Sequence, residues 1–190
     1  MSTDFVPIAV RIKDTDGETL VELPWAEALL ATEFGGDFRL RSDLFLAPLC
    51  RGDVVRCEVS ADGTLQVVDI RQLMPGLLIG FEHPRGTEAA VKRVLRDLHS
   101  IGYQVRRPFD GCVQIFVPGA ELDRDFPFAR LPKSWERRLL LDGPFRMRAA
   151  MEQIDFSIST DSVGRVETLD HREPDHPGWA RLEPELVLPG

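Results

Sequence analysis

The sequence has no apolar run near the roughly 18 residues that a membrane-spanning helix requires. Its opening residues, Met1 to Asp4, also lack the basic start and the apolar stretch of a secretory signal. From these two absences we expect a cytoplasmic protein that is not attached to a membrane.

Cysteine is scarce, with only Cys50, Cys57 and Cys112 in the chain. An odd number of cysteines without an export signal argues against structural disulfides. Cys50 and Cys57 lie seven positions apart, with no Cys-x-x-Cys pair and no histidine nearby in sequence, which argues against a zinc site. We expect three free thiols that are buried or half-buried.

The familiar nucleotide-binding and hydrolase motifs are missing as well. There is no Gly-x-Gly-x-x-Gly, no Walker-type loop and no Gly-x-Ser-x-Gly turn. One candidate for chemistry is His83, which precedes Pro84 at the end of a predicted strand, where a loop can present a general base. Another is the pair His171 and His176, in a segment whose imidazoles and carboxylates suit zinc or manganese.

Neither candidate is supported by its neighbours in sequence. Pro174 and Pro177 keep the segment around the two histidines off a helix, so no regular spacing brings the two imidazoles together. A solvated acidic loop is therefore the preferred interpretation of that segment. We predict no catalytic residue, no cofactor and no metal ligand.

What the chain does have is an ordinary globular composition, with 43% hydrophobic and 28% charged residues. Its formal charge of −8 works against nucleic-acid binding, because attraction to phosphate dominates that affinity. The charge is uneven, since residues 85–141 carry 11 basic and 7 acidic groups while both flanks are acidic. Such an uneven distribution of charge can steer a charged partner, or let a basic face of the protein pair with an acidic one, or keep the protein soluble.

Residues 1–75 are predicted to form a small antiparallel β unit. Apolar alternation and turn residues predict strands at Val6–Lys13, Glu18–Leu23, Asp37–Leu40, Val54–Ser60 and Thr64–Ile70. The stretch Trp25–Phe34 fits a short helix or a strand, and Gly35-Gly36 is expected to break it. About five strands in so short a span predict a barrel-like or strongly curled sheet.

Residues 76–158 are predicted to form an α+β unit. A strand at Leu77–Phe81 is followed by a helix with its N-cap at Thr87 and its C-cap at Gly102, and then by a hairpin with strands Tyr103–Arg107 and Cys112–Val117. This strand–helix–strand–strand order predicts a ferredoxin-like arrangement. Lys133–Leu141 and Phe145–Ile154 are predicted as short helices, with Trp135 facing inward.

Residues 159–190 are predicted as the remnant of a hairpin and an acidic, proline-rich tail. Trp179 in that tail either packs into the domain or waits for a partner. We predict partner contacts at Trp179, at the tail carboxylates Asp170, Glu173 and Asp175, and at Arg106 and Arg107 in the basic centre. The basic centre and its nearby aromatics, Tyr103, Phe109 and Phe116, keep RNA binding open as an alternative.

Four segments of the first 70 residues resemble a bacterial family known only as a domain of unknown function. These are Glu22-Leu23-Pro24-Trp25-Ala26-Glu27, Phe38-Arg39-Leu40, Leu44-Phe45-Leu46-Ala47 and Gly52-Asp53-Val54-Val55. Their order and approximate spacing agree with the family, and the strand–helix–strand at residues 77–117 is also similar. Two departures stand out, since Ile70–Gly76 lacks the family's histidine segment and Leu44 stands in place of a proline.

Proteins of that type look like immunity factors, which block a toxin made by the same or a neighbouring cell. The resemblance therefore implies a non-catalytic protein that binds a cognate toxin or another protein, and we expect it to be monomeric without its partner. An acidic inhibitor suits a basic toxin surface. An RNA-associated or regulatory domain, and an enzyme that uses His83 or the His171/His176 segment, remain the alternatives.

Overall fold

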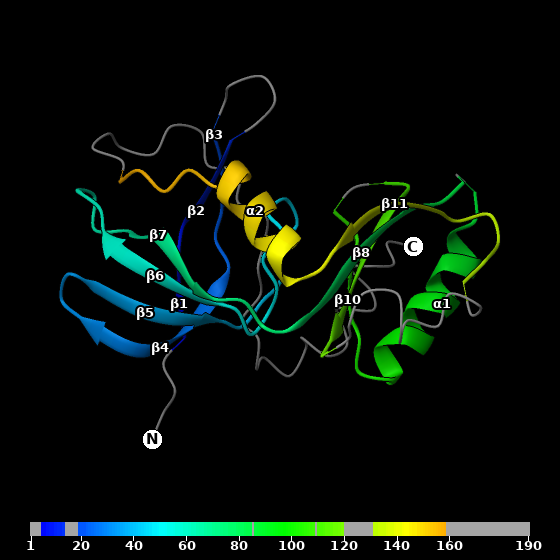
Figure 1. The fold of residues 1–190 in the computed structure, drawn as a ribbon, viewed down its shortest axis with the longest axis horizontal. Coiled ribbons are helices and arrows are strands. Elements are labelled where there is room, and N and C mark those ends of the chain that lie inside the picture. Colours follow the sequence, from blue (N-terminus) through cyan, green and yellow to red (C-terminus); the bar gives the residue numbers. More distant parts are fainter. Residues whose placement is uncertain (1–4, 14–18, 85, 109, 120–130, 159–190) are drawn as a thin grey trace. The chain divides into compact units, whose positions relative to one another are not determined.

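The structure is a computed structural model that describes residues 5–13, 19–84, 86–108, 110–119 and 131–158. These residues form a mixed α+β protein of mostly antiparallel sheets and two helices, which confirms the predicted class (Figure 1). They divide into two compact units, residues 5–74 with 147–158 and residues 75–146. Neither helix in these ranges has the length and apolar character needed to cross a membrane.

The first unit holds a five-stranded antiparallel sheet in the order β1-β4-β5-β6-β7 and a separate β2–β3 hairpin. The prediction of one strand over Val6–Lys13 is wrong, because the chain changes partners at Ile8 and Ala9. The Ile8 amide donates to the Pro24 carbonyl and the Ala9 amide to the Leu65 carbonyl. The strands are β1 (Phe5–Pro7), β2 (Val10–Lys13), β3 (Thr19–Glu22), β4 (Trp25–Thr32), β5 (Gly35–Leu40), β6 (Val54–Val59) and β7 (Leu65–Gln72).

The ambiguous stretch after Pro24 is the strand β4, and Gly35-Gly36 does not interrupt the sheet but opens β5. A Cβ at Gly36 would press into the Leu30 carbonyl of β4, and one at Gly35 into the Cys57 carbonyl of β6. Gly35 also has a φ of +132°, which side chains other than glycine rarely adopt. The two glycines therefore let three strands approach closely at this end of the sheet.

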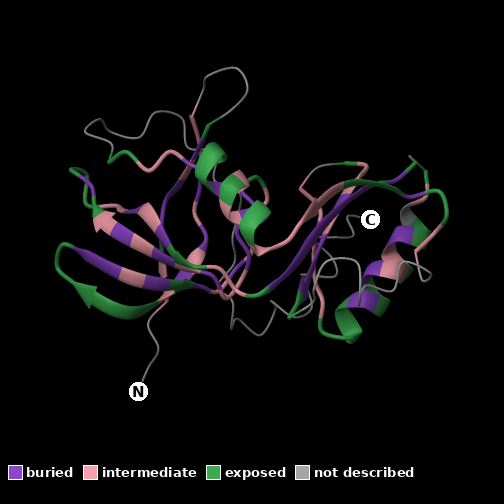
Figure 2. Cartoon of the chain, viewed as in Figure 1, coloured by how far each residue is buried: buried purple, intermediate pink, exposed green. Residues whose placement is uncertain are grey.

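One face of this sheet covers the core of the first unit, and along β6 buried positions (purple) alternate with intermediate ones (pink) (Figure 2). The β2–β3 hairpin contributes Ile12 to this core. The helix α2 (Gly143–Gln153) contributes Met147 and Ala150, which are followed by Ile154 at helical spacing. The helix predicted over Phe145–Ile154 is thus confirmed, and its second half packs with the first unit.

The second unit contains β8 (Gly76–Glu82), α1 (Glu88–Ser100), β9 (Gln104–Arg106), β10 (Cys112–Pro118) and β11 (Glu136–Leu141), with sheet order β11-β8-β10-β9. The predicted strand–helix–strand–strand order from β8 to β10 is confirmed. Val91, Leu95 and Leu98 of α1 are buried against this sheet, as their spacing predicts.

The helix predicted at Lys133–Leu141 is wrong, because residues 136–141 pair with the edge of β8 as β11. Gly80 of β8 presents no side chain, and Leu139 packs into the space this leaves. An available strand edge has overridden the local helix preference. Trp135 does face inward, since it is buried against Phe81 with ring centroids 5.9 Å apart.

The two ends of α1 differ in how well they match their predicted caps. Thr87 occupies the N-cap position, but its hydroxyl donates to the Pro84 carbonyl at 2.6 Å rather than capping a helical amide. At the other end the cap residue is Ile101, and Gly102 follows it with a φ of +92°. The Gly102 amide bonds the His99 carbonyl, which closes the helix in the usual glycine-containing manner.

The units differ from the predicted segments at one place. The first unit ends at Met74, close to the predicted boundary at residue 75, whereas residues 147–158 pack with the first unit and not with the second. The change of unit falls inside α2, between Arg146 and Met147. The predicted tail at residues 159–190 lies outside the described residues.

Candidate functional site

The residues that carry the family resemblance hold the first unit together through two buried carboxylates. Glu22 is fully buried at the end of β3, and its carboxylate accepts the amides of Phe45, Leu46 and Ala47 at 2.7, 3.2 and 3.4 Å. The apolar stretch Leu44–Leu49 is thereby fixed as a loop. Hydrogen bonds from amides to an ionised carboxylate are stronger than those between neutral groups, so Glu22 is a structural anchor for this loop.

Asp53 has the same role in the Gly52-Asp53-Val54-Val55 segment. Its carboxylate accepts the Cys50 amide on one oxygen and the Met74 amide on the other, both at 2.7 Å. Gly52 precedes it with a φ of +100°, where a Cβ would meet the Met74 sulfur. These contacts tie the start of β6 to Met74, which follows β7, so we expect the segment to contribute to the stability of the first unit.

His83, the candidate general base, is buried at 5% exposure beside the indole of Trp135, with ring centroids 5.8 Å apart. Its Nδ1 lies 3.2 Å from the Pro84 carbonyl and 3.4 Å from the Thr87 hydroxyl. No described residue hydrogen-bonds its Nε2. The ring is packed under the start of α1 and is not presented at a surface.

The three cysteines are free, as predicted: Cys50 and Cys57 are buried and Cys112 is partly buried. Burial, and secondarily Asp37, raises the pKa of Cys57 to about 12. Burial and the nearby Glu82 also raise the pKa of Cys112, against a smaller lowering by Arg106. Such thiols stay protonated at neutral pH and are poor nucleophiles.

No group of three or more histidine, cysteine or acidic side chains is placed to hold a metal ion in the part of the chain that the structure describes. The other candidate segment, His171 to His176, falls outside the described residues, together with the predicted partner residues Asp170, Glu173, Asp175 and Trp179. Those partner contacts stay predictions.

The remaining predicted partner residues, Arg106 and Arg107, lie at the end of β9. Arg106 is buried, and its Nε donates to the Gln114 side chain at 2.7 Å. The Arg107 side chain is only 10% exposed, and it pairs with Asp110 at 3.4 Å. Their partner contacts also stay predictions, although both guanidiniums already have partners within the second unit.

Part of the basic stretch at residues 92–107 is exposed as a row on α1. Arg93, Arg96 and His99 are exposed at successive spacings of three residues, so they lie along one side of the helix. Beside them a depression of about 450 Å³ is lined by Val94, Asp97, Leu98, Ser100 and Ile101. The aromatics that RNA binding would use are less accessible, because Phe116 is buried beneath the Arg146 guanidinium and Phe109 lies outside the described residues.

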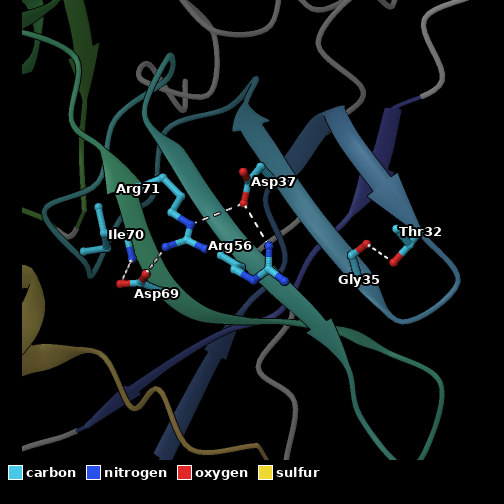
Figure 3. Close-up of polar contacts among 7 residues, drawn as sticks. All are labelled: Thr32, Gly35, Asp37, Arg56, Asp69, Ile70 and Arg71. Carbon is cyan, nitrogen blue, oxygen red and sulfur yellow. Dashed lines mark hydrogen bonds and ion pairs between the residues drawn. The ribbon is translucent and has the colours of Figure 1, made fainter.

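The solvent face of the five-stranded sheet is covered by ion pairs. Asp37 of β5 lies 3.5 Å from Arg56 of β6 and 3.4 Å from Arg71 of β7, and Arg71 also pairs with Asp69 at 2.9 Å (Figure 3). At the other end of β5, Glu27 pairs with Arg39 and Arg41 at 3.9 and 3.8 Å. The arginines of this face are thus matched by carboxylates of the same face.

The end of the sheet beyond these pairs is different, and we call it the hairpin end: Leu29, Leu30, Glu33, Phe34, Glu58 and Val59. The β4–β5 turn closes with the Thr32 hydroxyl donating to the Gly35 carbonyl at 3.0 Å (Figure 3). The adjoining end of β6 is held by the Val59 amide, which donates to the Phe34 carbonyl at 3.1 Å. Phe34 is 75% exposed and Leu30 is 67% exposed.

The hairpin end gathers exposed apolar side chains. Among the described residues nine large hydrophobic side chains are exposed, and four of them are Leu29, Leu30, Phe34 and Val59. Scattered apolar residues on a surface need no explanation, whereas a concentration of them marks an interaction site. Sequence reasoning missed this site because it treated Trp25–Phe34 as an unresolved element, although the Thr-Glu-Phe-Gly-Gly turn was readable.

Comparison with known proteins adds little. No protein-family model matches the chain, and no curated protein matches it. A solved structure described as a "Novel crystal structure of a hypothetical protein from Neisseria gonorrhoeae" is 14% identical, with 62% of this chain and 77% of that chain covered and a TM-score of 0.41.

Proposed function

We propose that this chain is a non-catalytic protein-binding module that acts as an immunity protein, binding and blocking a cognate toxin. The observation that carries the proposal is the hairpin end, where Phe34 and Leu30 stand exposed at the end of an ordered sheet. Aromatic and aliphatic anchors of this kind supply most of the energy of protein–protein binding. The four motif segments that resemble the bacterial family point in the same direction.

The build of the sheet supports a preorganised binding surface. Asp37, Arg56 and Arg71 link three neighbouring strands across the solvent face. In the same unit the buried carboxylates of Glu22 and Asp53 hold loop amides. A surface that is ordered before binding loses less conformational entropy when the partner docks. An inhibitor needs this property more than it needs any reactive group.

The proposal is tested by co-expressing the chain with the product of each adjacent reading frame. We expect one of them to halt growth when it is expressed alone, and this chain to restore growth and to purify with it as a one-to-one complex. An unrelated acidic protein of similar net charge is the control for generic charge attraction. If no neighbouring product binds the chain and none is neutralised by it, the proposal is wrong.

RNA association is the second candidate, and the row Arg93, Arg96 and His99 on α1 is the observation that favours it. Phosphate contacts release counterions, so real binding must weaken as salt rises. A filter-binding titration with single-stranded RNA at two salt concentrations tests this candidate. The paired variant Arg93→Glu with Arg96→Glu should abolish the signal if the row is the site.

For the second unit we further propose a ferredoxin-like arrangement. Numbered along the chain as β8, β9, β10 and β11, its strands lie in the order 4-1-3-2, with α1 connecting the first two. This order supports the proposal, since it is the one expected when a β-α-β-β unit is extended by one further edge strand. For the first unit the barrel-like description likewise stays a proposal.

A further inference from the structure

The charge around the hairpin end says what kind of partner it fits. The segments that build it, residues 28–38 and 57–70, contain no lysine, arginine or histidine and five acidic residues. Two of the five, Asp37 and Asp69, are paired with Arg56 and Arg71. The other three are Glu33, Glu58 and Asp62, and none of them pairs with a cation among the residues that the structure describes.

Two of the three unmatched carboxylates adjoin exposed apolar side chains, and the third lies in the following turn. Glu33 adjoins Phe34 in the β4–β5 turn, and Glu58 adjoins Val59 and lies opposite Gly35 in the β5–β6 ladder. Asp62 lies in the next turn, where the Ser60 hydroxyl donates to it at 2.6 Å and the Thr64 amide at 3.0 Å. These donors lower the pKa of Asp62, the Ser60 hydroxyl most, so its charge is fixed at neutral pH.

We propose that the hairpin end docks a basic protein partner, whose apolar pocket receives Phe34 and whose lysine or arginine side chains pair with Glu33 and Glu58. A second copy of this chain does not fit, because the same three carboxylates would face one another across the contact. A partner with apolar character alone would leave these charges desolvated and unmatched. This inference rests on the proposed function, since it names the surface and the partner chemistry of the same binding activity.

The contrast with the rest of the sheet makes the inference specific. The arginines on β5, β6 and β7, which are Arg39, Arg56 and Arg71, each have a carboxylate within 4.0 Å. The charges on this part of the sheet's solvent face therefore largely cancel. The hairpin end instead combines exposed apolar side chains with carboxylates that pair with no cation among the described residues. Charge of one sign speeds association with an opposite partner and makes that rate depend on salt.

The test uses the full chain and the neighbouring gene product that co-expression identifies as its partner. Phe34→Ser should weaken binding about thirtyfold or more, as truncation of a central aromatic anchor does. Glu33→Lys with Glu58→Lys should slow association at least tenfold at low salt and flatten its salt dependence. Phe145→Ser, at 54% exposure on α2, and Glu152→Lys, on the same helix, are the matched controls and should bind as the unchanged chain does.

The outcomes separate the two proposals. If a complex forms but the hairpin-end variants bind with unchanged affinity, or no more weakly than the two controls, the docking surface is wrong and the proposed function stands. If no neighbouring product forms a complex, both proposals fail together. Sedimentation of the chain alone completes the test, because concentration-dependent dimers that Phe34→Ser abolishes would assign the hairpin end to self-association and overturn the basic partner.

Discussion

Replacing Asp53 tests whether the family-like Gly52-Asp53-Val54-Val55 segment is structural. Asp53 is fully buried, and each of its carboxylate oxygens accepts one amide at 2.7 Å, from Cys50 and from Met74. Hydrogen bonds to a charged group contribute about 1.5–3 kcal/mol each, so Asp53→Ala should lower the free energy of unfolding of the first unit by about 3–6 kcal/mol. That is a large share of the stability of a domain this size.

Two further variants make the magnitude diagnostic. Asp53→Asn keeps one acceptor oxygen but places its NH2 group against a backbone amide, so it should cost about half as much as Asp53→Ala, about 1.5–3 kcal/mol. Asp43→Ala in the same region removes a single partly buried contact, to the Arg51 amide at 2.8 Å. That change should cost only about 1–2 kcal/mol.

The assay is urea unfolding combined with amide hydrogen exchange. Asp53→Ala should remove protection from the Cys50 and Met74 amides in particular, while Asp43→Ala should affect the Arg51 amide. The reasoning is refuted if Asp53→Ala lies within 1 kcal/mol of the unchanged chain and both amides keep their protection. A loss of partner binding in a stable, fully protected Asp53 variant would instead make the segment part of the binding site.

Three other outcomes follow from the structure. Burial, and then Asp37, raises the pKa of Cys57 to about 12, so this thiol should resist alkylation in the folded chain at pH 8 and react in urea. The stability that Cys57 contributes should fall as pH rises above 9.0, where the unfolded thiol ionises. Rapid labelling of the folded protein would contradict this. Burial acts to raise the pKa of Asp155, but the Ser157 hydroxyl and amide, and then Arg11, outweigh burial and lower this pKa. The unchanged chain should therefore be more stable than Asp155→Asn at pH 7, and this difference should vanish as pH falls below 3.8. Gly36→Ala should cost about 3 kcal/mol because its Cβ meets the β4 backbone, whereas Gly143→Ala, with open space around it, should be neutral in the same thermal unfolding assay.

Elements with strong local signals could be predicted from the sequence. The Asp62-Gly63 turn fixed the hairpin of β6 and β7, and the apolar positions of α1 fixed its buried face, because turn residues and helical spacing act over a few positions. The α2 helix was predicted within two residues of its start for the same reason. The break between β1 and β2 was not, since it depends on Pro24 and Leu65 being nearby in space.

The strand β11 shows where such reasoning fails. Its residues Glu136 to Leu141 suit a helix, and they become a strand only because β8 offers an unpaired edge and Gly80 leaves room for Leu139. Local preference is weaker than a row of backbone hydrogen bonds that only the folded chain provides. No pattern within six residues could have indicated this.

The candidate site was harder to predict than the fold. The tail was assigned as a partner site because its acidic residues and Trp179 make an unusual composition. The hairpin end is assembled from the β4–β5 turn and the end of β6, which lie about 25 residues apart in sequence. Among the described residues Asp37 pairs with two arginines, whereas Glu33 and Glu58 pair with none, and this difference depends on how the strands are paired. Arg106 and Arg107 likewise stood out by charge, yet their burial depends on β9 pairing with β10.

The central claim is that this chain acts through the shape and charge of its exterior. Isothermal titration of the purified chain with the product of the adjacent reading frame, at low and at high salt, tests that claim most directly. We predict a one-to-one complex with a Kd of about 1 μM or tighter at low salt, equivalent to roughly −8 kcal/mol, and weaker at high salt. Absence of binding at both salt concentrations, or an affinity indifferent to salt and to Phe34→Ser, would contradict it.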